Sequence, residues 1–103
     1  MTQKFERVLV ANRGEIACRV IRTLHKMGID TVAVYHHEDR TSPYVNLAKE
    51  AVEITANNAT AAYLDIEQIL QVAENFSVEA IHPGYGFLSE NPRFASAVAE
   101  RGL

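Results

Sequence analysis

Several features that mark particular protein classes are missing from this sequence of 103 residues. The single cysteine, Cys18, cannot form an intrachain disulfide, so nothing in the chain calls for an oxidising compartment. No apolar run approaches the roughly 18 residues of a membrane-spanning helix, and the N-terminus lacks a signal-peptide profile. The formal charge of -3 argues against the basic surface that binds nucleic acid. We therefore expect a protein of the cytoplasm or an organelle matrix that binds neither nucleic acid nor membranes.

The remaining composition is that of an ordinary globular domain. Apolar residues make up 48% of the chain and charged residues 22%, which excludes intrinsic disorder and fibrous repeats. The length suits one hydrophobic core, and no linker or internal repeat divides the sequence. Residues 1–103 are therefore expected to form a single domain.

Short β-branched runs alternate with stretches of helical periodicity. The run 7–11 predicts a buried strand, and apolar residues between 16 and 24 recur at helical spacing before Gly28, a residue suited to a helix end. Further strands are expected at 31–35, 51–54 and 79–82, and further helices at 43–47, 66–76 and from 92 onward, with a polar loop around 57–60. This alternation predicts an α/β fold, a Rossmann-like parallel sheet of about four strands in the order 3-2-1-4 with helices on both faces.

Two loops are expected at the carboxyl ends of the first and fourth strands. In the order 3-2-1-4 these loops leave the sheet in opposite directions, and ligands of open α/β sheets bind in the crevice at such a switch point. The first loop holds the sequence Asn12-Arg13-Gly14-Glu15, and the second runs from His82 to Asn91 as HPGYGFLSEN.

The first loop does not fit a nucleotide site. The dinucleotide fingerprint requires three glycines in this turn, whereas only Gly14 is present. Glu15 places a carboxylate in the first helical turn, where it opposes a bound phosphate. The sequence also lacks a GxxxxGK[ST] loop, so we expect neither a dinucleotide site nor a P-loop in this domain.

The second loop is suited to close contact with a small ring. Gly84 and Gly86 let the backbone approach a partner and present its N–H groups. Tyr85, between them, offers a flat apolar ring. A turn alone does not need both glycines, so Tyr85 and Gly86 are interpreted as binding residues. Phe87 and Leu88 fit a structural role in the core.

The first helix carries a basic stripe of Arg19, Arg22 and Lys26 opposite its apolar face. Glu15 and Arg19 also form an i,i+4 pair in the favourable orientation. A solvated helix face explains such a stripe, and a subunit interface is the alternative, because arginine is enriched at interfaces.

The remaining polar residues give no catalytic constellation. Adjacent residues on a strand point to opposite faces, so His36 and His37 do not form a chelating pair. His82 ends a strand beside the crevice, where a structural role and an acid–base role are both open. Cys18 lacks a partner at metal spacing. We therefore expect no metal site and no catalytic residue in this chain.

Two segments together resemble the N-terminal domain of biotin carboxylase: VANRGEIA at 10–17 and HPGYGFLSEN at 82–91. This domain opens the acetyl-CoA, propionyl-CoA, methylcrotonyl-CoA, pyruvate and urea carboxylases. The resemblance covers essentially the whole chain. It implies a pre-ATP-grasp fold and an ATP-dependent ligase, in which ATP and bicarbonate form carboxyphosphate and biotin on a carrier protein captures the released carbon dioxide.

The resemblance also implies which parts of the enzyme lie elsewhere. In the family, ATP, Mg²⁺ or Mn²⁺ and the catalytic base belong to an ATP-grasp domain that follows this one, so the chain alone is expected to be inactive. The implied partners are a biotin carboxyl carrier protein or domain, a carboxyltransferase and a second copy of the chain. The implied setting is an acyl-CoA carboxylase, such as the acetyl-CoA carboxylase of fatty acid biosynthesis, in the cytoplasm or, in a eukaryote, the mitochondrial matrix.

Residue roles follow from the matching positions. Tyr85 and Gly86 are similar to residues that face the biotin ring, and Glu90 is similar to an acid near the cleft. The homodimer interface of bacterial members corresponds to Arg19, Arg22 and Lys26, and a structural role at the crevice corresponds to Asn12, Arg13, Gly14, Glu15, His82 and Gly84.

A different class of function is also compatible with the alternation of strands and helices. A stand-alone Rossmann-like module that binds a ligand or a partner without catalysis has the same fold class, because fold does not determine function.

Overall fold

A computed structural model of the chain describes residues 5–84 and 87–103. The strands are β1 (Arg7–Val10), β2 (Asp30–His36), β3 (Glu50–Ile54) and β4 (Ala80–His82). The helices are α1 (Gly14–Lys26), α2 (Pro43–Leu47), α3 (Ala59–Ala62), α4 (Ile66–Asn75) and α5 (Pro92–Glu100), with 3-10 turns η1 (His37–Asp39) and η2 (Phe87–Glu90).

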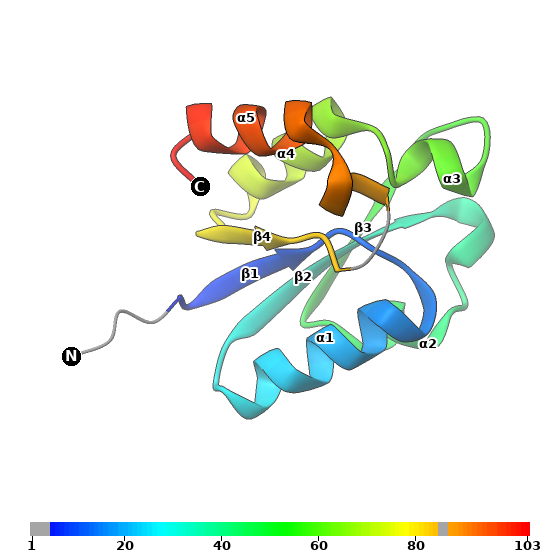
Figure 1. The fold of residues 1–103 in the computed structure, drawn as a ribbon. Helices are drawn as coiled ribbons and strands as arrows, with labels where there is room; N and C mark the ends of the chain where they lie inside the picture. Colours follow the sequence, from blue (N-terminus) through cyan, green and yellow to red (C-terminus); the bar gives the residue numbers. More distant parts are fainter. Residues whose placement is uncertain (1–4, 85–86) are drawn as a thin grey trace.

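The four strands form one parallel sheet in the order β3-β2-β1-β4, which confirms the predicted topology. β1 lies in the middle, where Val8 is paired with Thr31 of β2 and with Ala80 of β4. Helices α1 and α2 cover one face of the sheet, and α4 and α5 cover the other (Figure 1). All four strands therefore end at one edge of the sheet, and the loops after them share that edge.

The core lies between the sheet and the two helical layers. β1 and β2 are buried on both faces, as expected for inner strands of a parallel sheet. Their apolar runs therefore show no alternation between polar and apolar residues. Side chains with essentially no exposure come from the two strands and from helices on either side: Leu9, Val10, Val32, Val34, Ile21, Ile69 and Leu70.

Capping side chains fix where several helices begin. The side chain of Asp65 accepts a hydrogen bond from the N–H of Gln68 at 3.1 Å, and Asn91 accepts from the N–H groups of Arg93 and Phe94. Asp and Asn are among the residues preferred at the N-cap of a helix. Ser42 stands at the N-cap of α2, but its side chain makes no capping bond, and Pro43 at the first helical position sets the start instead.

One short helix was not expected. The segment 57–60 was predicted as a polar loop, whereas α3 begins at Ala59. The side chain of Asn58 accepts a hydrogen bond from the N–H of Ala61 at 2.9 Å and starts this single turn. Ala59 and Ala62 face the core, so two small buried residues stabilise a helix too short to show a periodic pattern. Within residues 5–84 and 87–103, no helix is long and apolar enough to span a bilayer.

Candidate functional site

Residues of several loops meet at the edge where the strands end. Asn12 and Arg13 follow β1, Asp39 follows β2, Tyr63 follows the short helix after β3, and Gly84 follows β4. These residues are far apart in the sequence and meet because parallel strands place their carboxyl ends at the same edge. This edge is the candidate site.

The side chain of Asn12 joins the first and last of these loops. Asn12 is fully buried, and its Nδ2 donates a hydrogen bond to the carbonyl oxygen of Pro83 at 2.7 Å. Its Oδ1 accepts from the N–H of Arg13 at 2.8 Å. The two loops, expected on opposite sides of a crevice, are therefore in direct contact at their bases.

Gly84 packs closely against the same residue. A Cβ atom on Gly84 would lie 2.9 Å from Nδ2 of Asn12 and 2.9 Å from Cγ2 of Ile16, and the backbone has φ of +70°. The Gly84 N–H donates to Nδ1 of His82 at 3.0 Å. This bond gives His82 a structural contact in the loop. A structural role was one of the two that the sequence left open for His82, beside an acid–base role.

An open apolar groove lies beside this contact, between α1 and the end of β4. Its lining residues are Ile16, Arg19, Val20, His82 and Gly84. The groove runs along the face of α1 that carries Arg19. The crevice was predicted between the two loops, whereas this groove lies beside them, next to α1.

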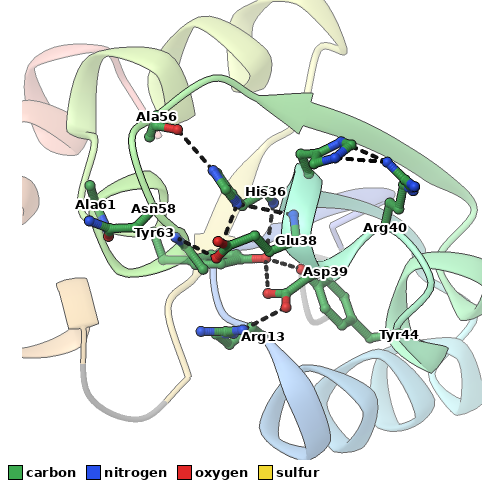
Figure 2. Close-up of polar contacts among 12 residues, drawn as sticks. Arg13, His36, Glu38, Asp39, Arg40, Tyr44, Ala56, Asn58, Ala61 and Tyr63 are labelled. Carbon is green, nitrogen blue, oxygen red and sulfur yellow. Dashed lines mark hydrogen bonds and ion pairs between the residues drawn. The ribbon is translucent and has the colours of Figure 1, made fainter.

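A second polar network connects the loops after β1, β2 and β3 (Figure 2). Nη2 of Arg13 donates to Oδ1 of Asp39 at 2.5 Å, and the hydroxyl of Tyr63 donates to Oδ2 of Asp39 at 2.8 Å. The hydroxyl of Tyr44 contacts the Tyr63 hydroxyl and donates to the carbonyl of Val34 at 3.0 Å. The Arg13 guanidinium also lies 5.5 Å from the centre of the Tyr63 ring, within cation–π range.

His36 extends this network towards the loop after β3. It is buried, its Nδ1 accepts from the N–H of Glu38 at 3.1 Å, and its Nε2 lies 2.9 Å from the carbonyl oxygen of Ala56. Because Nδ1 is an acceptor, Nε2 carries the proton and donates to Ala56, which fixes the neutral tautomer. The His36 N–H also donates to the Tyr63 hydroxyl at 3.2 Å. His36 therefore has a structural role.

Sequence reasoning had selected Arg13 but none of its partners in this network. Asp39 comes soon after β2 and Tyr63 directly after α3, and both lie at the expected edge of the sheet. Among the described residues, no buried side-chain oxygen or nitrogen lacks a hydrogen-bond partner. The buried polar atoms of the network are therefore satisfied, and Arg13 has Asp39 as its carboxylate partner.

Burial sets the protonation state of both tyrosines. Burial raises the pKa of Tyr63, the contact with the Tyr44 hydroxyl and the hydrogen bond from the His36 N–H oppose this effect, and the Asp39 carboxylate reinforces it, so the pKa rises from 10 to about 12. Burial and the contact with Tyr63 raise the pKa of Tyr44 still further above its ordinary value. Both hydroxyls therefore stay protonated near neutral pH.

The raised pKa of Tyr63 predicts a loss of stability at alkaline pH. An unfolded tyrosine ionises near pH 10, whereas folded Tyr63 keeps its proton up to about pH 12. Its contribution is therefore full below pH 10 and is lost as the pH rises through 12. At about 1.4 kcal/mol for each pKa unit, the free energy of unfolding should fall by about 2–3 kcal/mol across this window.

Urea unfolding at a series of pH values measures this effect. Tyr63→Phe should show a smaller decline above pH 10 than the unsubstituted chain. Tyr35→Phe, at a half-buried tyrosine outside the network, is the matched control. Equal declines in the unsubstituted chain and in Tyr63→Phe would contradict the assignment.

The basic stripe lies on the exposed face of α1. Arg19, Arg22 and Lys26 are all exposed, as predicted. The predicted partner of Glu15 was wrong: Glu15 forms its ion pair with Arg22 at 3.7 Å, not with Arg19. Arg19 instead lines the groove beside β4. The ion pair of Arg22 with Glu15 spans about two turns of helix. Such an exposed pair adds little stability.

The binding residues inferred from the second loop cannot be placed. Tyr85 and Gly86 lie outside the described residues, and so does the side chain of Glu90. Of the predicted crevice residues, Asn12, Arg13, His82 and Gly84 meet at the sheet edge, whereas Gly14 begins α1 and Glu15 points to solvent. In the part of the chain that the structure describes, no three His, Cys, Asp or Glu side chains form a group that can hold a metal ion.

Comparison with known proteins identifies similar chains. A family model described as "Biotin carboxylase, N-terminal domain" matches residues 4–103. The mitochondrial methylcrotonoyl-CoA carboxylase subunit alpha of Rattus norvegicus is 54% identical over 97 residues, which are 94% of this chain and 14% of that protein. Biotin carboxylase 2 of Bacillus subtilis (strain 168) is 48% identical over 99 residues, which are 96% of this chain and 22% of that protein.

A solved structure shares the fold. The biotin carboxylase domain dimer of Hydrogenobacter thermophilus 2-oxoglutarate carboxylase, in complex with MgADP, ADP and bicarbonate, is 50% identical with a TM-score of 0.95. The match covers 99% of this chain and 22% of that one. This agreement confirms the predicted fold class. The chain spans less than a quarter of the length of each of these proteins.

Proposed function

The chain belongs to the biotin carboxylase N-terminal domain family, and we propose on this premise that it forms the N-terminal part of an ATP- and bicarbonate-dependent biotin carboxylase. The observation that carries the proposal is the match of the family model to residues 4–103, nearly the whole chain. The same match favours this function over a stand-alone Rossmann-like binding module. The ligase activity belongs to the longer enzyme, and this chain alone is proposed to be inactive.

Within that enzyme, the sheet edge is proposed to form one wall of the biotin site. The described part of this edge supports the proposal, because Asn12 and Gly84 pack tightly where the chain enters the segment Tyr85-Gly86. Tyr85 and Gly86 are proposed to face the ring of biotin held on its carrier, and Glu90 is proposed to lie near the cleft. An aromatic ring beside a glycine suits close packing on a small heterocycle.

ATP and its metal ion are proposed to bind mainly outside this chain. The first loop has a single glycine, and Glu15 occupies the helix start where a phosphate would bind. The described residues also include no metal-holding group. ATP with Mg²⁺ or Mn²⁺ therefore fits residues of the longer enzyme better than residues of this chain.

The partners and setting follow from the same premise. We propose that Arg19, Arg22 and Lys26 take part in a homodimer interface, and a similar domain is a dimer in its solved structure. A biotin carboxyl carrier and a carboxyltransferase are the other proposed partners. The proposed setting is an acyl-CoA carboxylase, such as acetyl-CoA carboxylase in fatty acid biosynthesis, because two groups of relatives are methylcrotonoyl-CoA and propionyl-CoA carboxylases. The proposed location is the cytoplasm, or the mitochondrial matrix in a eukaryote.

A chimaeric enzyme tests the proposed function. In it, this chain replaces the matching segment of Bacillus subtilis biotin carboxylase 2, and bicarbonate-dependent ATP hydrolysis is measured with and without free biotin. Tyr85→Ala removes the ring and Gly86→Val blocks close approach, so each should lower the biotin-stimulated rate by about tenfold, a loss of about 1.4 kcal/mol.

The control is Met27→Ala, which removes an exposed side chain after the carboxyl end of α1, close to the start of β2. This variant should retain the biotin-stimulated rate. A chimaera without biotin stimulation would refute the proposed function. Stimulation that survives both Tyr85→Ala and Gly86→Val would refute the proposed wall of the site.

A further inference from the structure

We propose that Asn12 is a positioning residue for biotin carboxylation, because its buried amide holds Pro83 and Gly84, which lead directly into Tyr85. This inference rests on the proposed function and adds a residue to it. Asn12 is not proposed to touch biotin. It acts through the backbone of the second loop.

The amide of Asn12 continues the pairing of β1 with β4 beyond the end of the strands. The last backbone bond between the two segments runs from the N–H of Ala11 to the carbonyl of His82 at 2.9 Å. One residue further along each segment, Nδ2 of Asn12 donates to the carbonyl of Pro83 at 2.7 Å. A side chain thus takes the place of a ladder bond at the point where the chain enters the proposed biotin wall.

The position requires both ends of the amide. Nδ2 donates to the carbonyl of Pro83, while Oδ1 accepts from the N–H of Arg13 at 2.8 Å. The second bond orients the Asn12 side chain against the backbone of the next residue. An aspartate side chain at this position would lack the donor, and an apolar side chain would lack both groups. Because Asn12 is fully buried, water cannot replace either bond at low cost.

Steric contact reinforces the hydrogen bond. The Gly84 backbone lies so near Nδ2 of Asn12 and Cγ2 of Ile16 that an added Cβ would stand 2.9 Å from each atom. On its other side, the Gly84 N–H is held by Nδ1 of His82 at 3.0 Å. The Pro83–Gly84 peptide is therefore held at its carbonyl by Asn12 and at its N–H by His82, and Asn12 contributes both a bond and a packing surface. Small misplacements of a binding segment lower reaction rates strongly.

The first experiment uses the chimaera with Bacillus subtilis biotin carboxylase 2, with free biotin as the probe. Asn12→Asp keeps the size and the acceptor for Arg13 but removes the donor, and Asn12→Ala removes both groups. In each variant the biotin-stimulated rate of ATP hydrolysis should fall by about tenfold, while the rate without biotin stays within about twofold. Asn46→Asp adds the same charge at an exposed position of α2 and should change neither rate.

The outcomes separate positioning from general stability. An unchanged biotin-stimulated rate would overturn the proposal, and so would an equal fall of both rates in both variants, since a merely structural role gives that result. Failure of the proposed function has a different signature, because the unsubstituted chimaera would then show no biotin stimulation.

A second experiment tests the hydrogen bond from Asn12 to Pro83 without an activity measurement. In the ¹⁵N-labelled 103-residue chain, Asn12→Asp should shift the amide resonance of Gly84 and speed its hydrogen exchange, whereas Asn46→Asp should leave both unchanged. A Gly84 amide that does not respond to Asn12→Asp would overturn the proposal whatever the chimaera does.

Discussion

Gly84→Ala is expected to lower the free energy of unfolding by about 2–4 kcal/mol, through backbone strain and overpacking together. The backbone at Gly84 has φ of +70°, a region that residues with a Cβ adopt at a cost. The new methyl group would also stand 2.9 Å from Nδ2 of Asn12 and from Cγ2 of Ile16. Nδ2 of Asn12 cannot move freely, because Asn12 is buried and hydrogen-bonded at both ends of its amide. Chemical denaturation of the 103-residue chain measures the loss.

The chain supplies a matched control that separates the two causes. Gly28 has φ of +78°, but a Cβ there would meet nothing within 4 Å. Gly28→Ala should therefore cost only the conformational strain, about 1–2 kcal/mol. The difference between the two variants measures the packing of Gly84 on Asn12 and Ile16. Equal losses would contradict a tight contact between these residues.

Asp39→Ala is expected to cost about 2–3 kcal/mol, because it removes the common partner of two groups at the sheet edge. The Arg13 guanidinium would lose its carboxylate, and the Tyr63 hydroxyl would lose its acceptor. The side chain of Arg13 is 36% exposed, so water compensates part of this loss, whereas Tyr63 is fully buried and receives no such compensation. Asp39→Asn keeps one acceptor oxygen and should lose less than Asp39→Ala.

An exposed ion pair provides the comparison. Glu67 lies 3.3 Å from Arg101, and its side chain is 80% exposed. Glu67→Ala should change the free energy of unfolding by less than about 0.5 kcal/mol, as solvated pairs do. A loss for Asp39→Ala no larger than that for Glu67→Ala would show that the network adds no stability.

The sequence predicted the sheet because its signals are local and repeated. Apolar runs such as 31–35 and helical spacing such as that of α1 depend only on neighbouring residues, and the strand order follows from general rules of connection. The N-caps Asp65 and Asn91 are local features of the same kind. Each cap and the N–H group that it accepts lie within one turn of helix.

The polar site was only partly predictable, because its partners are distant in sequence. Arg13 was selected from its loop, but Asp39 and Tyr63 look like ordinary surface and core residues until the sheet brings them together. Glu15 pairs with Arg22, seven residues further along the helix, whereas the i,i+4 rule points to Arg19. The bond from Asn12 to Pro83 likewise exists only after β1 and β4 have paired.

The central position of β1 also affects the order in which the sheet is assembled during synthesis. One neighbour of Val8 is Thr31, which leaves the ribosome soon afterwards, whereas the other is Ala80, which is synthesised much later. The first strand therefore keeps one side unpaired until the fourth strand has been synthesised, and this interval exposes nascent chains to wrong associations. Pairing of β4 is therefore the step that closes this side of β1.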